Sequence, residues 1–356
     1  MEAEHTATTQ TMPIRFSGSA GEYFRIWIVN IALTVVTLGI YSPWAKVRKL
    51  RYFYTNTSLE DGHFDYHANP KAILIGRLIA VGMLAVYYVS GYISPVASVV
   101  VIAIIVLAIP WLVVRSRIFQ LRNTSYHGLR FNFQRNYKDS FKAFYGGTLI
   151  TIVTLGFGAP TAIYMRNKFV ADNAGFGQTQ FVFGGRQGEF YAIFWKSVGL
   201  AILGAIPLVL LMGGFSSLIE APEPGGDPAN VNLYTVLSLA PSIVFIAYYA
   251  AIGIYVQVRQ RNYVWNTTEL GDTSFTSTLS VTEMVGIYLT NGLAIILSLG
   301  LLVPWAQIRL AKYRADHLGV NLAGDWQEHI AALTDEGSAF GEEVGEVFDV
   351  DIDVAF

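Results

Sequence analysis

The chain of 356 residues contains no cysteine, and only 14% of its residues are charged. The first absence excludes disulfide bridges, thiolate nucleophiles and cysteine metal ligands. The second sets the chain apart from a typical soluble domain, in which about a quarter of the residues are charged. The sequence also has no G-x-S-x-G, H-E-x-x-H or G-K-[ST] motif. We therefore expect no catalytic residues, no cofactor and no metal, and the net charge of −2 gives no reason to expect a nucleic acid partner.

The sequence instead contains four long apolar runs. They cover residues 72–93, 95–114, 190–214 and 233–256. Each run matches the roughly 20 residues that cross a bilayer core as a helix. The first residues lack a basic start, so we expect no cleaved signal peptide. These runs predict a mainly α, polytopic membrane protein.

The 24 lysine and arginine residues avoid two long intervals, 78–114 and 197–258. The second interval contains an acidic loop at 215–232, which the positive-inside rule places outside the membrane. The same rule places the basic clusters at 46–51 and 115–122 in the cytoplasm. We therefore expect the four apolar runs to form two helical pairs that leave and return to the cytoplasm.

Three further apolar segments, at 23–44, 143–164 and 284–306, have cations on both sides. In each, a Leu-Gly pair is followed by proline four residues after the glycine, and glycine followed by proline is a typical helix stop. We predict short helices that re-enter the membrane or lie at its interface, and a full span is the alternative. The candidate functional or structural motif comprises Asn30, Gly39, Pro43, Trp44, Arg48, Gly156, Pro160, Asn291, Gly300, Pro304, Trp305 and Arg309.

Several of these residues have an expected physical role. The rings of Trp44 and Trp305 are expected at headgroup depth, and Arg48 and Arg309 are expected to meet anionic headgroups. Asn30 and Asn291 lie inside apolar segments, where an amide must form hydrogen bonds. The partner is either the backbone of a neighbouring helix or repeat, or a substrate. Because the tryptophan rings and the arginines are expected at headgroup depth, membrane lipids are the first expected partner.

A second pattern recurs between the apolar segments, at 56–66, 123–133, 173–183 and 266–277. Each copy has Asn, a turn with Gly and then a stretch that in three copies alternates aromatic residues, which is typical of a strand. We predict internal repeats in which membrane helices alternate with four short cytoplasmic β-hairpins. A lone hairpin is marginally stable, so the hairpins should pack together as a cap on the membrane face.

These patterns divide the chain into four parts. Residues 1–15 are predicted to be a polar tail, 16–182 a first membrane half, 183–314 a second membrane half, and 315–356 a short helix followed by an acidic tail. The helix is expected at 322–334. The acidic tail is expected to be solvated and disordered, and a docking segment for a cytoplasmic protein is the alternative.

The motifs together resemble the YjgN family of bacterial inner-membrane proteins, a family defined as a domain of unknown function. The resemblance covers Phe16 to Arg314. The residues that carry it are Glu22-Tyr23-Phe24, Ile26-Trp27, Asn30, Thr37-Leu38-Gly39, Pro43-Trp44-Ala45, Arg51-Tyr52, Asn56-Thr57, Asn123-Thr124, Thr154-Leu155-Gly156, Asn291, Leu299-Gly300 and Pro304-Trp305-Ala306. The middle copy departs from this pattern, with Thr161 in place of Trp and Gly147 in place of Asn. The resemblance implies a location in the inner membrane and no particular activity.

Three functions stay open at this point. The first is a non-enzymatic scaffold, envelope factor or lipid-interacting protein. The second is a transporter or channel for a small solute, which the repeats with broken helices suggest. The third is a membrane enzyme, for which no acid–base pair stands out. His63 and His67, near Asp61 and Asp65, could suit a metal on a helix, but on a strand they would stand about 13 Å apart, so we expect ordinary exposed side chains.

Overall fold

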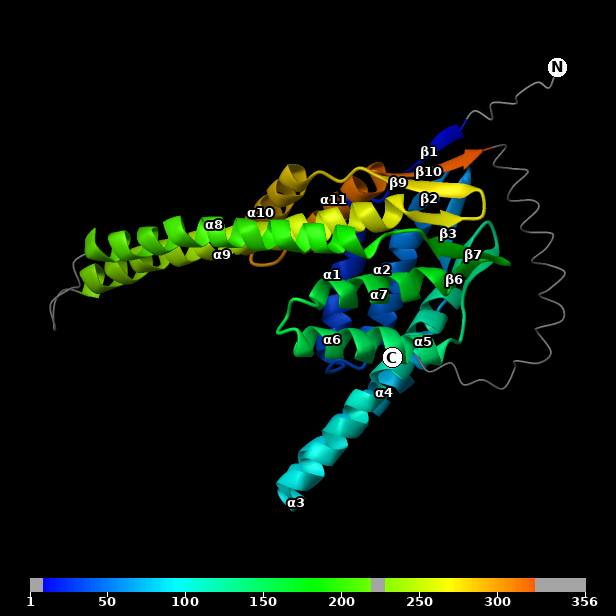
Figure 1. Ribbon diagram of the computed structural model, residues 1–356, viewed down its shortest axis with the longest axis horizontal. Helices are drawn as coiled ribbons and strands as arrows, with labels where there is room; N and C mark the ends of the chain where they lie inside the picture. The colour runs from blue at the N-terminus through cyan, green and yellow to red at the C-terminus, as the bar shows by residue number, and fades with distance from the viewer. Residues whose placement is uncertain (1–8, 219–227, 324–356) are drawn as a thin grey trace.

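The computed structural model describes residues 9–218 and 228–323, and it places helical pairs on one end of a small β-barrel (Figure 1). The barrel is antiparallel and closed, in the order β1-β10-β9-β8-β7-β6-β5-β4-β3-β2. Its strands are β1 (Thr9–Phe16), β2 (Thr57–Leu59), β3 (Gly62–Tyr66), β4 (Thr124–Tyr126), β5 (Leu129–Phe133), β6 (Ala174–Phe176), β7 (Thr179–Phe183), β8 (Thr268–Leu270), β9 (Thr273–Ser277) and β10 (Leu318–Ala323).

The barrel corrects the predicted fold class. The four repeated motifs were predicted as short β-hairpins packed into a cap, but they are hydrogen-bonded to one another and to β1 and β10 in one closed barrel. The barrel closes where β1 pairs with β10, from Thr9 opposite Ala323 to Pro13 opposite Gly319. Closure removes the unpaired strand edges that isolated hairpins would leave exposed. The closing pair joins residues more than 300 positions apart, so no local pattern could predict it.

Each excursion of the chain from the barrel is a pair of helices. In the described residues these are α1 (Ala20–Val36) with α2 (Ser42–Thr55), α3 (Pro70–Ile93) with α4 (Pro95–Arg122), α5 (Tyr137–Phe141), the π-helical η1 (Lys142–Gly146) and α6 (Gly147–Val153) with α7 (Ala159–Asp172), α8 (Gln187–Leu218) with α9 (Pro228–Asn266), and α10 (Val281–Leu297) with α11 (Val303–Asp316). A strand leads into each pair and a strand leads out. The described chain is therefore built from five β-α-α-β units.

All five helical pairs leave and return at one rim of the barrel, because odd-numbered strands run toward that rim and even-numbered strands run away from it. The tight turns between β2 and β3, and their counterparts, lie at the other rim. Helices of neighbouring units are in contact: α2 with α3, α4 with α5, α7 with α8, and α9 with α10. The ring of helices closes between α11 and α1, just as the barrel closes between β10 and β1.

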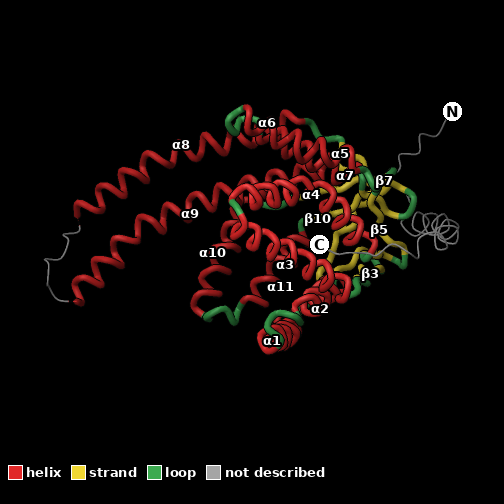
Figure 2. The backbone as a smooth tube through the Cα atoms, turned by 90° about the horizontal axis from the view of Figure 1, so that it is seen from below, coloured by secondary structure: helices red, strands yellow, loops and turns green. Residues whose placement is uncertain are grey.

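Two of the pairs are long and apolar. α3 and α4 project in one direction from the barrel, and α8 and α9 project in another (Figures 1 and 2). By length and composition, four helices are able to cross a membrane: Pro70–Ile93, Pro95–Arg122, Gln187–Leu210 and Leu239–Asn266. The four long runs therefore form helices that are long and apolar enough to cross a membrane, as predicted.

The other three pairs correspond to the predicted segments 23–44, 143–164 and 284–306. None of them is a single helix, since the chain turns back between α1 and α2, between α6 and α7, and between α10 and α11. We refer to these three pairs as the short hairpins. Part of the predicted N-terminal tail is strand β1, and the boundary drawn at residue 183 falls at the end of β7. In the predicted helix at 322–334, the first two residues end β10 and the others lie outside the described residues, as does the acidic tail.

The barrel encloses an apolar core because alternate side chains along each strand point inward. The buried cluster at its centre consists of Met12, Leu59, Tyr126, Phe176, Leu270, Val320 and Leu322. Phe64, Phe131, Phe181 and Phe275, which occupy the same place in four successive hairpins, pack against this cluster. The period-two aromatic residues of the sequence therefore mark the inward face of the barrel.

Candidate functional site

The turn at the end of each short hairpin is built in the same way. α1 ends in a Schellman motif, in which the Gly39 N–H donates to the Thr34 carbonyl oxygen at 2.7 Å and the Leu38 N–H donates to the Val35 carbonyl oxygen at 3.1 Å. Both turn residues lie in the left-handed region, with φ of 51° at Leu38 and 92° at Gly39. Leu155-Gly156 and Leu299-Gly300 repeat these angles within a few degrees. Sequence reasoning placed the glycine at the cap, whereas leucine takes the first left-handed position and glycine the second.

The return helix starts from a hydroxyl and a proline. The Thr37 hydroxyl accepts a hydrogen bond from the Tyr41 N–H at 2.9 Å, and Thr154 and Ser298 play the same part in the other short hairpins. Proline then occupies the first turn of the return helix, where its missing N–H costs no hydrogen bond. Pro43, Pro160 and Pro304 are all fully buried. At each of the three predicted glycine–proline breaks, the chain therefore forms a hydrogen-bonded turn, and the proline that follows it is buried.

The tips of the short hairpins present apolar side chains outward. The exposed fraction is 94% for Leu38, 89% for Leu155 and 94% for Leu299. Their neighbours are exposed too, among them Val36 and Leu297. An apolar patch of this kind is unfavourable in water, because transfer into an apolar medium is favourable by roughly 25 cal/mol for each Å² of apolar surface. The tips are therefore suited to an apolar environment.

The predicted residue Asn30 joins the two helices of the first short hairpin. Its Nδ2 donates to the Ala45 carbonyl oxygen at 3.4 Å, and its Oδ1 accepts from Arg48 Nη1 at 3.3 Å. Asn30 is 7% exposed, so the amide has a partner at each end within the same unit. Trp44 is half-buried and stacks on Tyr41, with ring centroids 6.1 Å apart.

The last short hairpin repeats this arrangement. Asn291 Nδ2 donates to the Ala306 carbonyl oxygen at 3.2 Å, and Arg309 Nη1 donates to Asn291 Oδ1 at 3.2 Å and to Thr290 Oγ1 at 2.6 Å. The guanidinium of Arg309 also lies over the Trp305 ring, 5.3 Å from its centroid. The structure thus brings the predicted Asn, Trp and Arg residues together within each of these two units and not between units. The backbone partner accounts for the buried amides without a substrate.

The middle short hairpin explains the departure noted in its sequence. Gly147 replaces the asparagine, and a Cβ at this position would lie 2.9 Å from Cα of Ala162. Helices α6 and α7 are therefore in direct backbone contact where the other two short hairpins insert an amide. Thr161, which replaces tryptophan, instead forms a hydrogen bond with the Tyr191 hydroxyl of α8 at 2.9 Å.

Cations concentrate on the second helix of every unit, between its apolar part and the barrel. We call this set the basic belt; it consists of Lys46, Arg48, Lys49 and Arg51 on α2, Arg115, Arg117 and Arg122 on α4, Arg166 and Lys168 on α7, Arg259 and Arg261 on α9, and Arg309, Lys312 and Arg314 on α11. Cations in the last turns of a helix interact favourably with its dipole. Among the described residues, one member of the belt forms an ion pair: Lys168 lies 2.8 Å from Asp172. Most of the belt therefore has no carboxylate partner within the described residues, although several of its arginines form hydrogen bonds or stack on aromatic rings.

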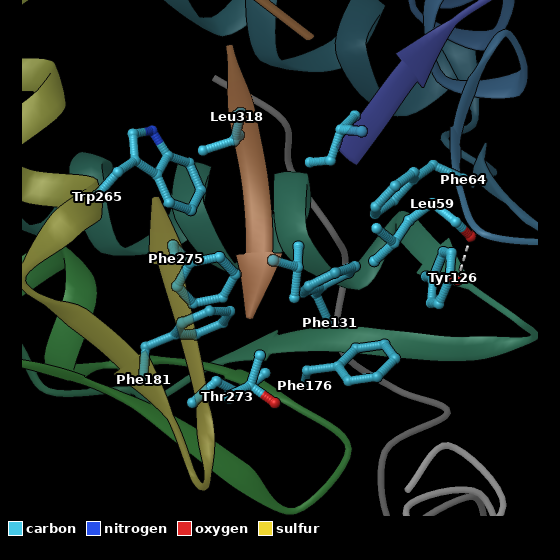
Figure 3. Close-up of a pocket in the computed structure, with 13 residues that line it drawn as sticks. Leu59, Phe64, Tyr126, Phe131, Phe176, Phe181, Trp265, Thr273, Phe275 and Leu318 are labelled. Carbon is cyan, nitrogen blue, oxygen red and sulfur yellow. Dashed lines mark hydrogen bonds between the residues drawn. The ribbon is translucent and has the colours of Figure 1, made fainter. Parts of the chain in front are cut away.

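A third feature is a cavity of about 140 Å³ inside the barrel (Figure 3). Aromatic and aliphatic side chains line it, including Phe131, Phe181 and Trp265. Tyr126 donates its hydroxyl proton to the Leu59 carbonyl oxygen at 2.7 Å. The hydroxyl of Thr273 lies against the cavity, is buried, and has no hydrogen-bond partner. A cavity of this size and polarity stays dry or holds a small apolar molecule.

The histidines of the sequence do not gather into a site. His63 and His67 are both exposed, and His67 Nε2 shares a hydrogen bond of 2.7 Å with Ser125 Oγ. Within residues 9–218 and 228–323, no group of three or more His, Asp or Glu side chains could hold a metal ion. The described part of the chain thus offers no metal centre to which a reaction could be assigned.

Sequence reasoning missed a structural tyrosine in three units. Tyr52 and Tyr313 accept hydrogen bonds from the N–H groups of Ser19 and Ser280, at 2.8 and 2.9 Å, and Tyr263 accepts from the Arg186 N–H. Each tyrosine lies on the second helix and fixes the point where the first helix of the same unit begins. The Arg51-Tyr52 pair of the family resemblance was the available signal.

Comparisons with known proteins extend the family resemblance. Residues 11–347 match the family described as "Bacterial protein of unknown function (DUF898)". The "Inner membrane protein YjgN" of Salmonella typhimurium is 26% identical over 358 residues, covering 86% of this chain and 87% of the relative. The protein of the same name from Escherichia coli (strain K12) is 24% identical over 205 residues, covering 57% of this chain and 47% of the relative. No solved structure matches.

Proposed function

Because the chain belongs to the DUF898 family, whose curated relatives are inner membrane proteins, we propose that it is a non-enzymatic, lipid-interacting protein of the bacterial inner membrane. In this proposal α3, α4, α8 and α9 cross the bilayer, and the barrel lies on its cytoplasmic face. The short hairpins enter the cytoplasmic leaflet from the barrel side and turn back. The basic belt then lies at the level of the headgroups.

The observation that carries the proposal is the tip of the short hairpins. Three left-handed Leu-Gly turns expose their leucines almost completely, and cations follow on each return helix before it reaches the barrel. An apolar tip with cations behind it is the pattern of a segment inserted into an anionic membrane surface. The 17 residues of α1 extend about 25 Å at 1.5 Å per residue, which is less than the roughly 30 Å of a hydrocarbon core.

The return of all five helical pairs to one rim supports the placement of the barrel on a single side. Two long pairs can cross and come back, and three short pairs can dip and come back, without moving the barrel across the membrane. Basic clusters then stay on one side, as the positive-inside rule favours for the cytoplasm. The acidic loop at 215–232 is placed in the periplasm by the same argument.

The two alternatives draw less support. A transporter or channel needs a polar path, and the barrel of the described residues is filled by an apolar core. A membrane enzyme needs reactive groups placed together, and the buried amides of Asn30 and Asn291 are already bonded within their own units. The relatives bear no name that assigns either activity.

Cysteine mapping tests the placement, because the chain contains no native cysteine. Single cysteines at the exposed positions Asp61 and Gln187 and at Asp227 are treated in intact cells with a membrane-impermeant thiol reagent. We expect labelling at Asp227 and none at the other two until the membrane is permeabilised. Labelling of Asp61→Cys in intact cells would overturn the proposed orientation.

Depth measurements test the insertion of the tips. Leu38→Cys, Leu155→Cys and Leu299→Cys, each carrying an environment-sensitive fluorophore, are reconstituted in vesicles with and without lipids brominated on the acyl chains. We expect blue-shifted emission and quenching by bromine at all three tips. The matched control is Asp272→Cys, which is exposed at the opposite rim of the barrel and should respond only to an aqueous quencher. Tips that behave like this control would contradict the proposal.

A cytoplasmic protein partner for the acidic tail at 335–356 stays a prediction. The last described strand, β10, ends at the rim opposite the helices, and the tail lies outside the described residues. Deletion of residues 335–356 should remove a protein that co-purifies with the full chain. An unchanged set of co-purifying proteins would show that the tail is not the docking segment.

A further inference from the structure

A groove lies in the basic belt where the last β-α-α-β unit packs against the first. We call this contact between the two units the seam and the groove the seam groove. It lies between α1, α2 and α11 and has a volume of about 510 Å³. Its polar side consists of Lys46 and Lys49 from α2, together with Asn30 and Gln307. Its apolar side consists of Trp27, Ile31 and Val35, which are spaced by four residues and therefore share one face of α1. We propose that this groove binds a single anionic phospholipid, with its headgroup at the two lysines and an acyl chain along α1.

The charge of the groove is uncompensated. No carboxylate lines it, and within the described part of the chain no ion pair involves Lys46 or Lys49. The ammonium group of Lys49 lies 5.8 Å from the centroid of the Phe53 ring. Burial lowers the pKa of Lys49, which means that its charged form lacks full solvation and would gain from an anion nearby.

Two grooves of similar size provide an internal comparison. The groove between α5 and α7, of about 480 Å³, is lined by Lys142 and Lys168 and also by two aspartates. The groove on α10 and α11, of about 500 Å³, is lined by Arg309 and Lys312 and also by Glu283 and Asp316. In both of these the acidic and basic side chains balance in number. Of the three grooves compared, the one at the seam alone carries two positive charges and no negative ones.

The internal repeat shows that the fold does not require these lysines. When the Leu-Gly and proline residues of the units are aligned, Lys46 corresponds to Gln307 and Lys49 corresponds to Leu310 in the last unit. The last unit forms the same hairpin, with the same Asn–Arg contact, without either cation. Lys46 and Lys49 are therefore dispensable for the turn and available for a ligand.

The apolar face of α1 in the groove indicates that the ligand is a phospholipid and not a free phosphate. The helix α1 runs from the barrel toward the tip, and the Asn30–Ala45 hydrogen bond sets the two lysines level with its middle. From there Ile31 and Val35, which are 39% and 68% exposed, continue along α1 toward the tip. A free phosphate would use the lysines alone, whereas a phospholipid would use both sides of the groove. Basic pockets between membrane helices are suited to anionic headgroups in this way.

This inference rests on the proposed function, because the groove must face the leaflet that the short hairpins enter. The test compares the wild-type full chain with Lys46→Gln/Lys49→Leu, which installs the residues that the last unit uses. The matched control is Lys138→Gln/Lys142→Gln, which removes the same charge from two exposed lysines of α5 and η1 that lie outside the basic belt. Binding of phosphatidylglycerol and of phosphatidylcholine to purified protein in detergent is measured by native mass spectrometry, with inorganic phosphate as competitor.

We expect the wild type and the control to prefer phosphatidylglycerol. The double variant of the seam should bind it about 10 to 30 times more weakly, as two membrane-surface cations imply. Its thermal unfolding and its tip quenching in brominated lipid should match the wild type. Equal loss in the control, no loss in the seam variant, or complete competition by inorganic phosphate would overturn the lipid site. If the seam variant loses its preference for phosphatidylglycerol while bromine still quenches the tip fluorophores, the lipid site is supported. If the tips are instead exposed to water, the proposed function itself is refuted.

Discussion

Two threonines of one β-hairpin allow a sharp test of the barrel interior. Thr268 and Thr273 lie on the paired strands β8 and β9, and both are at least 95% buried. The hydroxyl of Thr268 donates to the Val264 carbonyl oxygen at 2.7 Å, whereas that of Thr273 has no partner. Replacement by valine keeps the branched shape in both cases and removes only the hydroxyl. Thr273→Val should therefore stabilise the protein, and Thr268→Val should destabilise it.

The magnitudes follow from hydrogen-bond energetics. A hydrogen bond contributes about 0.5 to 1.5 kcal/mol net, and a buried polar group without a partner costs about 1 to 3 kcal/mol. The two variants should thus differ by about 2 kcal/mol or more in free energy of unfolding, in opposite directions from wild type. For a large domain this corresponds to shifts in Tm of roughly 2 °C per kcal/mol. Tryptophan fluorescence is a suitable assay, since Trp265 lines the same cavity as Thr273.

One result would refute this reasoning. If Thr273→Val lowers Tm as much as Thr268→Val does, the Thr273 hydroxyl must have a partner inside the barrel, either a water molecule or a bound ligand. The cavity would then not be dry. A cavity of about 140 Å³ is large enough for a benzene-sized molecule, so that outcome would direct attention to ligand binding in the barrel.

Two further predictions concern the short hairpins. Gly147→Ala should destabilise the middle one by roughly 1 to 3 kcal/mol, because the new Cβ would lie 2.9 Å from backbone of Ala162. Its control Gly286→Ala, in α10 with open space around the added Cβ, should be neutral or slightly stabilising, and equal Tm shifts in both would argue against close helix contact. Asn291→Leu should cost about 1 to 3 kcal/mol through loss of its bonds to Ala306 and Arg309, measured by chemical denaturation in detergent; unchanged stability would mean that the amide has no structural role.

The local features of the fold could be predicted because they depend on neighbouring residues. Glycine with φ near 90° and proline in the first turn of a helix leave a sequence signature within five residues, so the breaks at Gly39, Gly156 and Gly300 were evident. The four long apolar runs were evident by length alone. The aromatic alternation around Phe64 and Phe131 identified strands, because the side-chain period of a strand is two.

The assembly of those features could not be predicted in the same way. Strand β1 has a short period-two pattern at Met12, Ile14 and Phe16, yet it was assigned to a polar tail. Its partners β2 and β10 lie about 40 and 310 residues away, so no neighbouring segment indicated the pairing. The common unit was also hard to recognise in the sequence, because three helical pairs are short and two are long. Their shared β-α-α-β unit is evident only once the strands are arranged in one barrel. The seam groove depends on α11 packing against α1, a contact between the two ends of the chain.

The pairing of the first strand with the last has a consequence for biogenesis. Thr9 precedes the four long helices in the chain, yet its neighbour Ala323 is made only after all four of them have been synthesised. Until then β1 can pair only with β2, and its other edge stays open to incorrect partners. Closure of the ring must therefore wait until β10 has been made, and a nascent chain that terminates before Leu318 would leave that edge of β1 without its partner.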